Sequence, residues 1–258
     1  MTSAVTESNE RKDYVNENIT LVQNKDGLTF GTDAYLLYAY LRKNSNGLAA
    51  DLGAGTGIIS LLAAAKGKFS QIYAFEIQES FASLIERNVS ENGFSDKIKT
   101  LCTPVQNIGS ELFGRFDCVF SNPPYMKKGS GFLNEKSEKY IARHEVCGDI
   151  NDFCSAAAKL LKYSGSFYVV WRPDRLTDLF DAMRSSKIEP KRITVVYPDA
   201  KSRPSLVLVE GKRGGSSGLF FTKPLIMHPD ASAKPLVYTE ELTYIYENGE
   251  FGEEYERA

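Results

Sequence analysis

The sequence has few residues that bind metals and no long apolar segment. Only 2 of its 258 residues are histidine, and its 4 cysteines show no Cys-x-x-Cys spacing. We therefore expect no metal site. No apolar run approaches the roughly 18 residues of a membrane span, and the polar segment 1–18 lacks the apolar core of a signal peptide. These absences exclude a membrane protein and argue against secretion.

Cys102 and Cys118 fall within predicted strands, so we expect both to be buried as small apolar side chains. Unpaired buried cysteines suit a reducing environment. We therefore expect a cytoplasmic protein.

A net charge of −2 hides an uneven distribution of charged residues. Residues 184–213 carry eight Lys or Arg against three acids, and residues 127–143 carry five against two. The segment from Tyr238 to Ala258 has seven glutamates and only Arg257 as a basic residue. The total argues against a protein that coats nucleic acid, but the basic segments allow RNA binding. Segment 184–213 can equally be a solvated surface of mixed charge.

Segments of strand and helix type alternate along most of the chain. The predicted strands are 48–51, 71–76, 98–102, 116–121, 166–171, 192–197 and 206–210. The predicted helices are 33–43 (capped by Thr32 or Asp33), 57–66, 79–92, 107–113, 150–162 (capped by Asp149) and 174–186. This alternation predicts a parallel sheet with right-handed crossovers. The loop 198–204 is too short for a crossover, so the last strand should run antiparallel.

A glycine-rich turn, Asp51-Leu-Gly53-Ala-Gly55-Thr-Gly57, lies between a short apolar strand and the start of a helix. Glycines at this spacing allow a tight turn and close approach of the backbone to a ligand at a helix N-terminus. The G-x-G-x-G spacing differs from the dinucleotide fingerprint. Glu76 ends the next predicted strand, where its carboxylate can accept both hydroxyls of a ribose. Together these residues predict a nucleoside-containing cofactor.

The segment Asn122-Pro123-Pro124-Tyr125 follows the strand 116–121. Two prolines fix φ and supply no N–H donors, so the chain cannot continue as a central strand. The carbonyls of this rigid turn, with the Asn122 amide, can accept hydrogens from a planar group bearing NH2 while the Tyr125 ring stacks on its face. Asp51, Glu76 and Asn122 all end predicted strands, which is the ligand-binding edge of such sheets.

These motifs resemble the class I S-adenosylmethionine-dependent methyltransferases of the Asn-Pro-Pro-Tyr branch, which methylate exocyclic or amide nitrogens. Three further segments resemble the tRNA(Val) adenine-N6 methyltransferase family: Phe30-Gly-Thr32-Asp-Ala34, Ala142-Arg143-His144-Glu145 and Val170-Trp-Arg-Pro173. The resemblance runs from about residue 18 to 211. It implies an α/β fold, Rossmann-like, with a seven-stranded mostly parallel sheet, one antiparallel strand and helices on both faces.

The resemblance also implies roles for individual residues. Asn122, Pro123, Pro124 and Tyr125 would be catalytic. The cofactor S-adenosyl-L-methionine would contact Thr32, Asp51, Gly53, Gly55, Gly57, Glu76 and Asn122. Lys127, Lys128, Arg143 and His144 are candidates for RNA contact, although His144 can also be a salt-bridged loop anchor. The chain departs from the family at Pro104, where an Asp would accept from the cofactor adenine; Thr103, Gln106 or a backbone carbonyl would replace it.

We therefore expect N6-methylation of an adenine in RNA, with a tRNA near its anticodon as substrate and partner. The domain organisation predicted is a polar, mobile N-terminal segment (1–17), a methyltransferase domain (18–211) and a C-terminal extension with an exposed acidic tail (212–258). Two alternatives stay open: a protein glutamine-N5 methyltransferase acting on release factors, and a catalytically silent methyltransferase-fold RNA-binding protein. DNA adenine methylation also stays possible, although no separate target-recognition domain is visible. The sequence does not indicate an oligomeric state.

Overall fold

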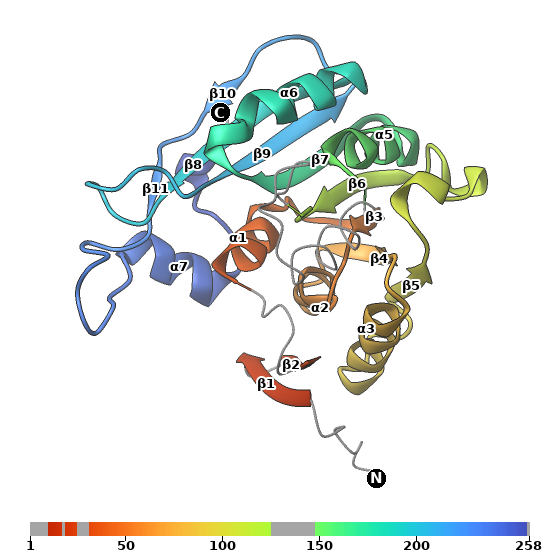
Figure 1. Cartoon of the computed structure of the whole chain (residues 1–258), viewed down its shortest axis with the longest axis horizontal. Helices are drawn as coiled ribbons and strands as arrows, with labels where there is room; N and C mark the ends of the chain where they lie inside the picture. Colours follow the sequence, from red (N-terminus) through yellow and green to blue (C-terminus); the bar gives the residue numbers. More distant parts are fainter. Residues whose placement is uncertain (1–9, 17–18, 25–30, 125–147, 257–258) are drawn as a thin grey trace, which may run out of the picture.

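A central β-sheet with helices on both faces forms the body of the protein in the computed structural model (Figure 1), which describes residues 10–16, 19–24, 31–124 and 148–256. Nine strands share this sheet, in the order β10-β8-β9-β7-β6-β3-β4-β5 with β11 beside β8. The strands are β3 (Asn44–Leu52), β4 (Phe69–Glu76), β5 (Ile98–Cys102), β6 (Phe116–Ser121), β7 (Leu161–Trp171), β8 (Ile188–Tyr197), β9 (Leu206–Arg213), β10 (Phe220–Phe221) and β11 (Leu225–Ile226).

The reversed strand is β9, which pairs antiparallel with both β7 and β8, whereas the remaining pairs of this sheet are parallel. The seven strands β3 to β9 confirm the mostly parallel sheet with one antiparallel strand. The sheet is larger than expected because β10 and β11 extend it beside β8. Each has only two residues, too few for a periodic sequence pattern.

Two apolar clusters lie on opposite faces of the sheet, as alternate residues of the central strands show: Ala49 belongs to one cluster and Ala50 to the other. One face is covered by α1 (Thr32–Tyr40), α2 (Ile58–Ala65), α3 (Glu79–Glu91) and α7 (Glu240–Asn248). The other face is covered by α5 (Ile150–Leu160), α6 (Leu176–Ser185) and the short helices η1 (Val105–Asn107) and η2 (Ser110–Leu112). Burial on both faces explains why the middle parts of the central strands, such as 48–50 and 118–120, are apolar.

The predicted N-cap is correct for α5 and wrong for α1. Asp149 caps α5, accepting from the N–H of Asn151 at 2.9 Å and completing a capping box with Asp152, as expected. The predicted cap of α1 is wrong: the N-cap is Gly31, so Thr32 and Asp33 lie inside the first turn. The Asp33 carboxylate is thereby available for a contact outside its own helix.

Residues 10–16 form β1, paired antiparallel with β2 (Ile19–Asn24) in a separate two-stranded sheet beside α3. Asn88 of α3 accepts from the Val22 N–H at 2.8 Å and donates to the Val22 carbonyl at 3.1 Å and to the Thr56 carbonyl at 3.2 Å. The expectation of a mobile segment is therefore wrong for residues 10–16. Asn88 also joins this hairpin to the glycine-rich turn, because Thr56 belongs to that turn.

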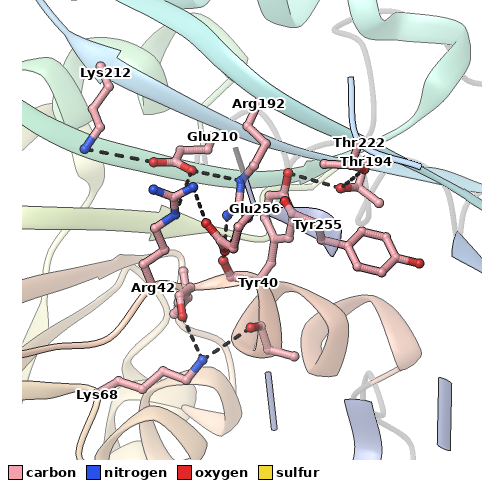
Figure 2. A network of polar contacts seen from close by, with 12 residues as sticks. Tyr40, Arg42, Lys68, Arg192, Thr194, Glu210, Lys212, Thr222, Tyr255 and Glu256 are labelled. Atoms are coloured by element: carbon pink, nitrogen blue, oxygen red, sulfur yellow. Dashed lines mark hydrogen bonds and ion pairs between the residues drawn. The ribbon is translucent and has the colours of Figure 1, made fainter. Parts of the chain in front are cut away.

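The C-terminal extension is packed against the body rather than exposed, which corrects the expectation of a free acidic tail. Leu242, Ile245 and Tyr255 are buried, and Figure 1 shows α7 beside α1. In Figure 2, Arg192 of β8 lies between Glu210 of β9 and Glu256 near the C-terminus, with Nε 3.0 Å from Glu210 Oε2 and Nη1 2.8 Å from Glu256 Oε1. The domain boundary proposed at residue 211 falls inside β9.

Much of the basic segment 184–213 also contributes to packing. Arg184 pairs with Glu189 at 3.2 Å, and Lys191 donates to the Ser216 carbonyl at 3.0 Å. Arg192 is buried, and Arg213 donates to the Leu161 carbonyl. Within the described residues, most of the positive charge of this segment is therefore tied to neighbouring acids and carbonyls.

Candidate functional site

The glycine-rich turn joins the end of β3 to the start of α2 in a conformation that its glycines make possible. Gly53, Gly55 and Gly57 have φ of +72°, +58° and +81°, values that other residues rarely adopt. The N–H groups of Gly53 and Ala54 donate to the Phe75 carbonyl at 2.9 and 3.0 Å. A Cβ at Gly55 would meet nothing within 4 Å, so the backbone there faces open space that a ligand can enter.

Asp51 lies buried beneath this turn, with 1 % of its surface exposed. The Ser60 hydroxyl of α2 donates to Oδ2 at 2.7 Å, whereas Oδ1 has no hydrogen-bond partner among the described residues. Burial raises the pKa of Asp51 to about 7, helped by the nearby charge of Glu76 and opposed by the Ser60 hydrogen bond. A buried carboxylate oxygen without a donor is costly, and a cationic ligand group in the site would offset that cost.

Glu76 ends β4 next to the turn and is 5 % exposed. Its Oε2 accepts from the Gly55 N–H at 2.9 Å and its Oε1 from the Gln78 N–H at 2.9 Å. Burial raises its pKa, and those backbone donors oppose the rise. The carboxylate thus has a fixed orientation beside the glycine-rich turn.

Asn122 follows β6, which pairs with β3 so that Phe120 lies opposite Asp51. The Ser121 hydroxyl donates to the Leu52 carbonyl at 2.7 Å and fastens this strand end to β3. The Asn122 amide nitrogen donates to Asp33 Oδ2 in α1 at 2.9 Å. Pro123 is buried and Pro124 half-buried, as expected for a rigid turn at this edge.

Thr32 opens α1 at the same edge of the sheet, one residue before Asp33. Its side chain is hydrogen-bonded to Tyr246 of α7, and the Tyr35 hydroxyl donates to the Tyr246 carbonyl at 2.8 Å. The C-terminal extension therefore holds the N-terminal end of α1 in place.

The structure brings most of the predicted cofactor residues together at the C-terminal edge of β3, β4 and β6. Glu76 contacts the turn at Gly55, Asp51 lies beneath it, and Asn122 follows the adjacent strand. The site combines two buried carboxylates with an open glycine turn. S-adenosylmethionine is compatible with this combination, because it carries ribose hydroxyls that a carboxylate can accept from and two positively charged groups that buried carboxylates complement. The residues Tyr125, Lys127, Lys128, Arg143 and His144 lie outside the described part of the chain.

The segment after β5 contains Pro104, at the position where the resemblance implies an Asp. The Pro104 carbonyl accepts from Asn107 N–H at 2.9 Å, and the Thr103 N–H donates to the Glu76 carbonyl at 2.9 Å. Gln106 donates through Nε2 to Asp152 of α5 at 3.1 Å. Cys102 is exposed at the end of β5, so the expectation that it is buried is wrong, whereas Cys118 is buried as expected.

Sequence reasoning missed Asp33, which was weighed only as a helix cap, and Ser60, which donates to Asp51. Asp33 could have been found because it adjoins Thr32 in the Gly-Thr-Asp segment. Over the residues described, no group of three or more His, Cys, Asp or Glu could hold a metal ion, and no helix is both long and apolar enough to cross a membrane. A cavity of about 560 Å³ lies at the C-terminal end of α1, lined by residues that include Lys68, Glu250 and Glu256, at the opposite end of the helix from Asp33.

Residues 22–186 match the methyltransferase small domain family. Proteins named tRNA1(Val) (adenine(37)-N6)-methyltransferase are similar to this chain. The protein from Dyadobacter fermentans is 30% identical over 158 residues, covering 61% of this chain and 64% of the relative, just under two thirds of its length. The one from Porphyromonas gingivalis is 29% identical over 208 residues, 77% of this chain and 81% of the relative.

Solved structures share the fold at lower identity. A predicted O-methyltransferase from Agrobacterium tumefaciens superposes with a TM-score of 0.67 at 23% identity, covering 84% of this chain and 96% of that protein. The geranyl diphosphate C-methyltransferase from Streptomyces coelicolor, solved with S-adenosyl-L-homocysteine, superposes with a TM-score of 0.52 at 13% identity, covering 70% and 79%.

Proposed function

This chain belongs to the methyltransferase small domain family and is an S-adenosylmethionine-dependent methyltransferase, and on that premise we propose that its methyl acceptor is the N6 amino group of an adenine in RNA. The names of its relatives support a tRNA as the RNA, with an adenine beside the anticodon as the target. The observation that carries the proposal is the Asn122 amide, held at the end of β6 by Asp33 at 2.9 Å and followed by two prolines.

On the cofactor side, the proposal assigns each residue a task. S-adenosylmethionine supplies a methyl group on a positively charged sulfur. Gly53 and Gly55 let the backbone approach its methionine end, Glu76 accepts from the ribose hydroxyls, and the charge of Asp51 complements the positive groups. Thr32, at the start of α1, closes the cofactor site from the side of that helix.

On the acceptor side, the adenine amino nitrogen is a poor nucleophile because its lone pair is delocalised into the ring. We assign acceptance of its two hydrogens to the Asn122 side-chain oxygen and the Pro123 carbonyl, which favours the pyramidal nitrogen on which positive charge develops. Tyr125 would stack on the base, contributing about 1–3 kcal/mol. No strong general base is needed, since the proton becomes acidic only after transfer. A base in structured RNA must be splayed out to reach this turn.

The decisive experiment is single-turnover methylation of an unmodified tRNA(Val) transcript, read as N6-methyladenosine by mass spectrometry. Asn122→Ala should lower kcat about 10² to 10³-fold, or about 2.7–4 kcal/mol by analogy with a lost oxyanion donor, with little change in RNA affinity. Asn46→Ala is the matched control, because Asn46 is exposed at the start of β3, at the opposite edge of the sheet.

Tyr125 gives a second comparison in the same assay. Tyr125→Phe should keep most activity because the ring face does the stacking, whereas Tyr125→Ala should lose it. A wild-type rate for Asn122→Ala would refute the adenine mechanism. Formation of methylglutamine in a release factor, with no methylated adenosine, would replace it with the glutamine-N5 alternative.

A further inference from the structure

We propose that Asp33 is a positioning residue for methyl transfer: its carboxylate selects and fixes the amide orientation in which the Asn122 oxygen faces the target amino group. The inference rests on the proposed function, because it concerns the same amide. It adds a residue that lies 89 positions before Asn122 in the sequence.

The geometry explains how a carboxylate can select one amide orientation. An amide side chain presents a donor NH2 at one end and an acceptor oxygen at the other, whereas an ionised carboxylate only accepts. Asp33 Oδ2 lies 2.9 Å from the Asn122 nitrogen. Because the amide is planar, fixing the nitrogen toward α1 also fixes the direction of the oxygen. The opposite flip would place two oxygens against each other.

Asp33 is itself held in place at both oxygens. Oδ1 accepts from the Ala34 N–H of its own helix at 2.9 Å while Oδ2 binds Asn122. Gly31 leaves room for this conformation, because a Cβ there would lie 2.7 Å from Asp33 Oδ1. The rest of the helix, from Ala34 to Tyr40, is buried. The carboxylate therefore stands on a rigid element, which positions a partner more precisely than a loop would.

The same contact has an electrostatic consequence. A hydrogen bond to an ionised acceptor is stronger than one between neutral groups, and hydrogen bonds in series polarise one another. In the proposed complex, the target N–H donates to the Asn122 oxygen, and the Asn122 nitrogen donates to Asp33. The Asp33 charge thus stabilises the positive charge that develops on the target nitrogen, without touching the base.

The test is a double-mutant cycle between Asp33→Asn and Asn122→Ala in single-turnover methylation of the tRNA(Val) transcript. Asp33→Asn keeps the shape of the side chain but removes its charge, and because an amide can donate as well as accept, it no longer selects one orientation of the Asn122 amide. We expect kcat to fall about 10- to 100-fold, with unchanged calorimetric affinity for S-adenosylmethionine and unchanged RNA affinity. In the Asn122→Ala background, Asp33→Asn should have no further effect on the rate. In the otherwise wild-type protein, Asp33→Glu keeps the charge and should therefore be faster than Asp33→Asn. Glu240→Gln, which removes an exposed acid from the first turn of α7, should behave as wild type.

A second readout needs neither RNA nor turnover. In the ¹⁵N-labelled protein, the Asn122 side-chain NH2 resonances should exchange slowly with solvent, and Asp33→Asn should speed that exchange while the thermal midpoint stays near the wild-type value. Multiplicative effects in the cycle, or an equal loss of cofactor affinity, would overturn the positioning role. If Asn122→Ala cripples the enzyme and Asp33→Asn does not, this inference alone fails; if Asn122→Ala is itself active, the proposed function fails.

Discussion

Asp51 is the residue whose protonation state connects the fold to the proposed binding of the cofactor. Burial raises its pKa to about 7, against an ordinary value near 4. Between about pH 4 and pH 7, Asp51 is therefore protonated in the folded protein and ionised in the unfolded chain. The contribution of Asp51 to stability is thus favourable at low pH and is lost as the pH rises through that range. A positively charged ligand reverses the preference, because it favours the ionised carboxylate.

The pH dependence of Asp51 can be tested in cofactor binding and in thermal unfolding. Calorimetry should find S-adenosylmethionine bound roughly tenfold more weakly at pH 6 than at pH 8, since the ionised fraction of Asp51 changes about tenfold across a pKa of about 7. Asp51→Asn should bind more weakly at pH 8 and lose most of this pH dependence. Without cofactor, the thermal midpoint of Asp51→Asn should rise relative to that of the wild type as the pH increases from 5 to 8, because only the wild type must bury an ionised carboxylate at high pH. An Asp51→Asn variant with the wild-type pH profile would assign the titration to another group.

At the scale of the element, Lys68 fixes the C-terminal end of the helix that carries Thr32 and Asp33. Its side-chain nitrogen donates to the carbonyls of Tyr38 at 3.0 Å, Ala39 at 3.3 Å and Leu41 at 2.7 Å, and Figure 2 shows the Lys68 side chain below Tyr40 and Arg42. Helix ends leave carbonyls without partners, and here one buried lysine side chain, whose pKa burial lowers to about 7, satisfies several. The α1 helix is thus held at both ends, by Lys68 at one and by Tyr246 at the other.

Lys68→Met should therefore destabilise the protein by about 1–3 kcal/mol, the cost of leaving buried carbonyls unpaired, as measured by urea unfolding. Lys66→Met is the matched control, because Lys66 lies two residues earlier and is exposed, and its loss should change stability by less than about 0.5 kcal/mol. Equal midpoints for the two variants would show that water replaces the ammonium without cost.

The elements that the sequence predicted best are those with a strong local signal. Strands at 98–102 and 116–121 begin and end where expected, because both are short segments bounded by turn residues. The hairpin of β1 and β2 was missed because it is hydrogen-bonded to Asn88 of α3 and to Asn92 at the C-cap of that helix, which are distant in sequence. The helix α7 was missed because its glutamates read as a solvated tail. At the site, strand ends and glycines located Asp51, Glu76 and Asn122, but only tertiary contact connects Asp33 with Asn122.

At the scale of the whole molecule, one buried ion pair joins the sheet to the C-terminus. Arg192 and Glu210 are each 3 % exposed and lie on adjacent strands. Arg192 also donates to the carbonyls of Tyr40 and Tyr255 at 3.2 Å, and its guanidinium lies 3.9 Å from the centre of the Tyr40 ring. Because one side chain contacts β9, α1 and the C-terminal segment at once, we expect the extension to unfold together with the sheet.

Arg192→Met should leave Glu210 as a buried charge with weaker compensation, because its other cationic neighbours among the described residues, Arg42 at 3.6 Å and Lys212 at 3.9 Å, are both partly exposed. We expect a loss of about 3 kcal/mol in urea unfolding, at the low end of the range for a broken buried pair. The double variant Arg192→Met/Glu210→Met should recover most of it, since no buried charge remains. Arg184→Met, which breaks the more exposed pair with Glu189, should cost less than about 1 kcal/mol. If the double variant is no more stable than Arg192→Met, the loss of stability comes from the carbonyl and ring contacts of Arg192. In that case, the C-terminal segment of Arg192→Met should be the first part of the chain to exchange its amide hydrogens.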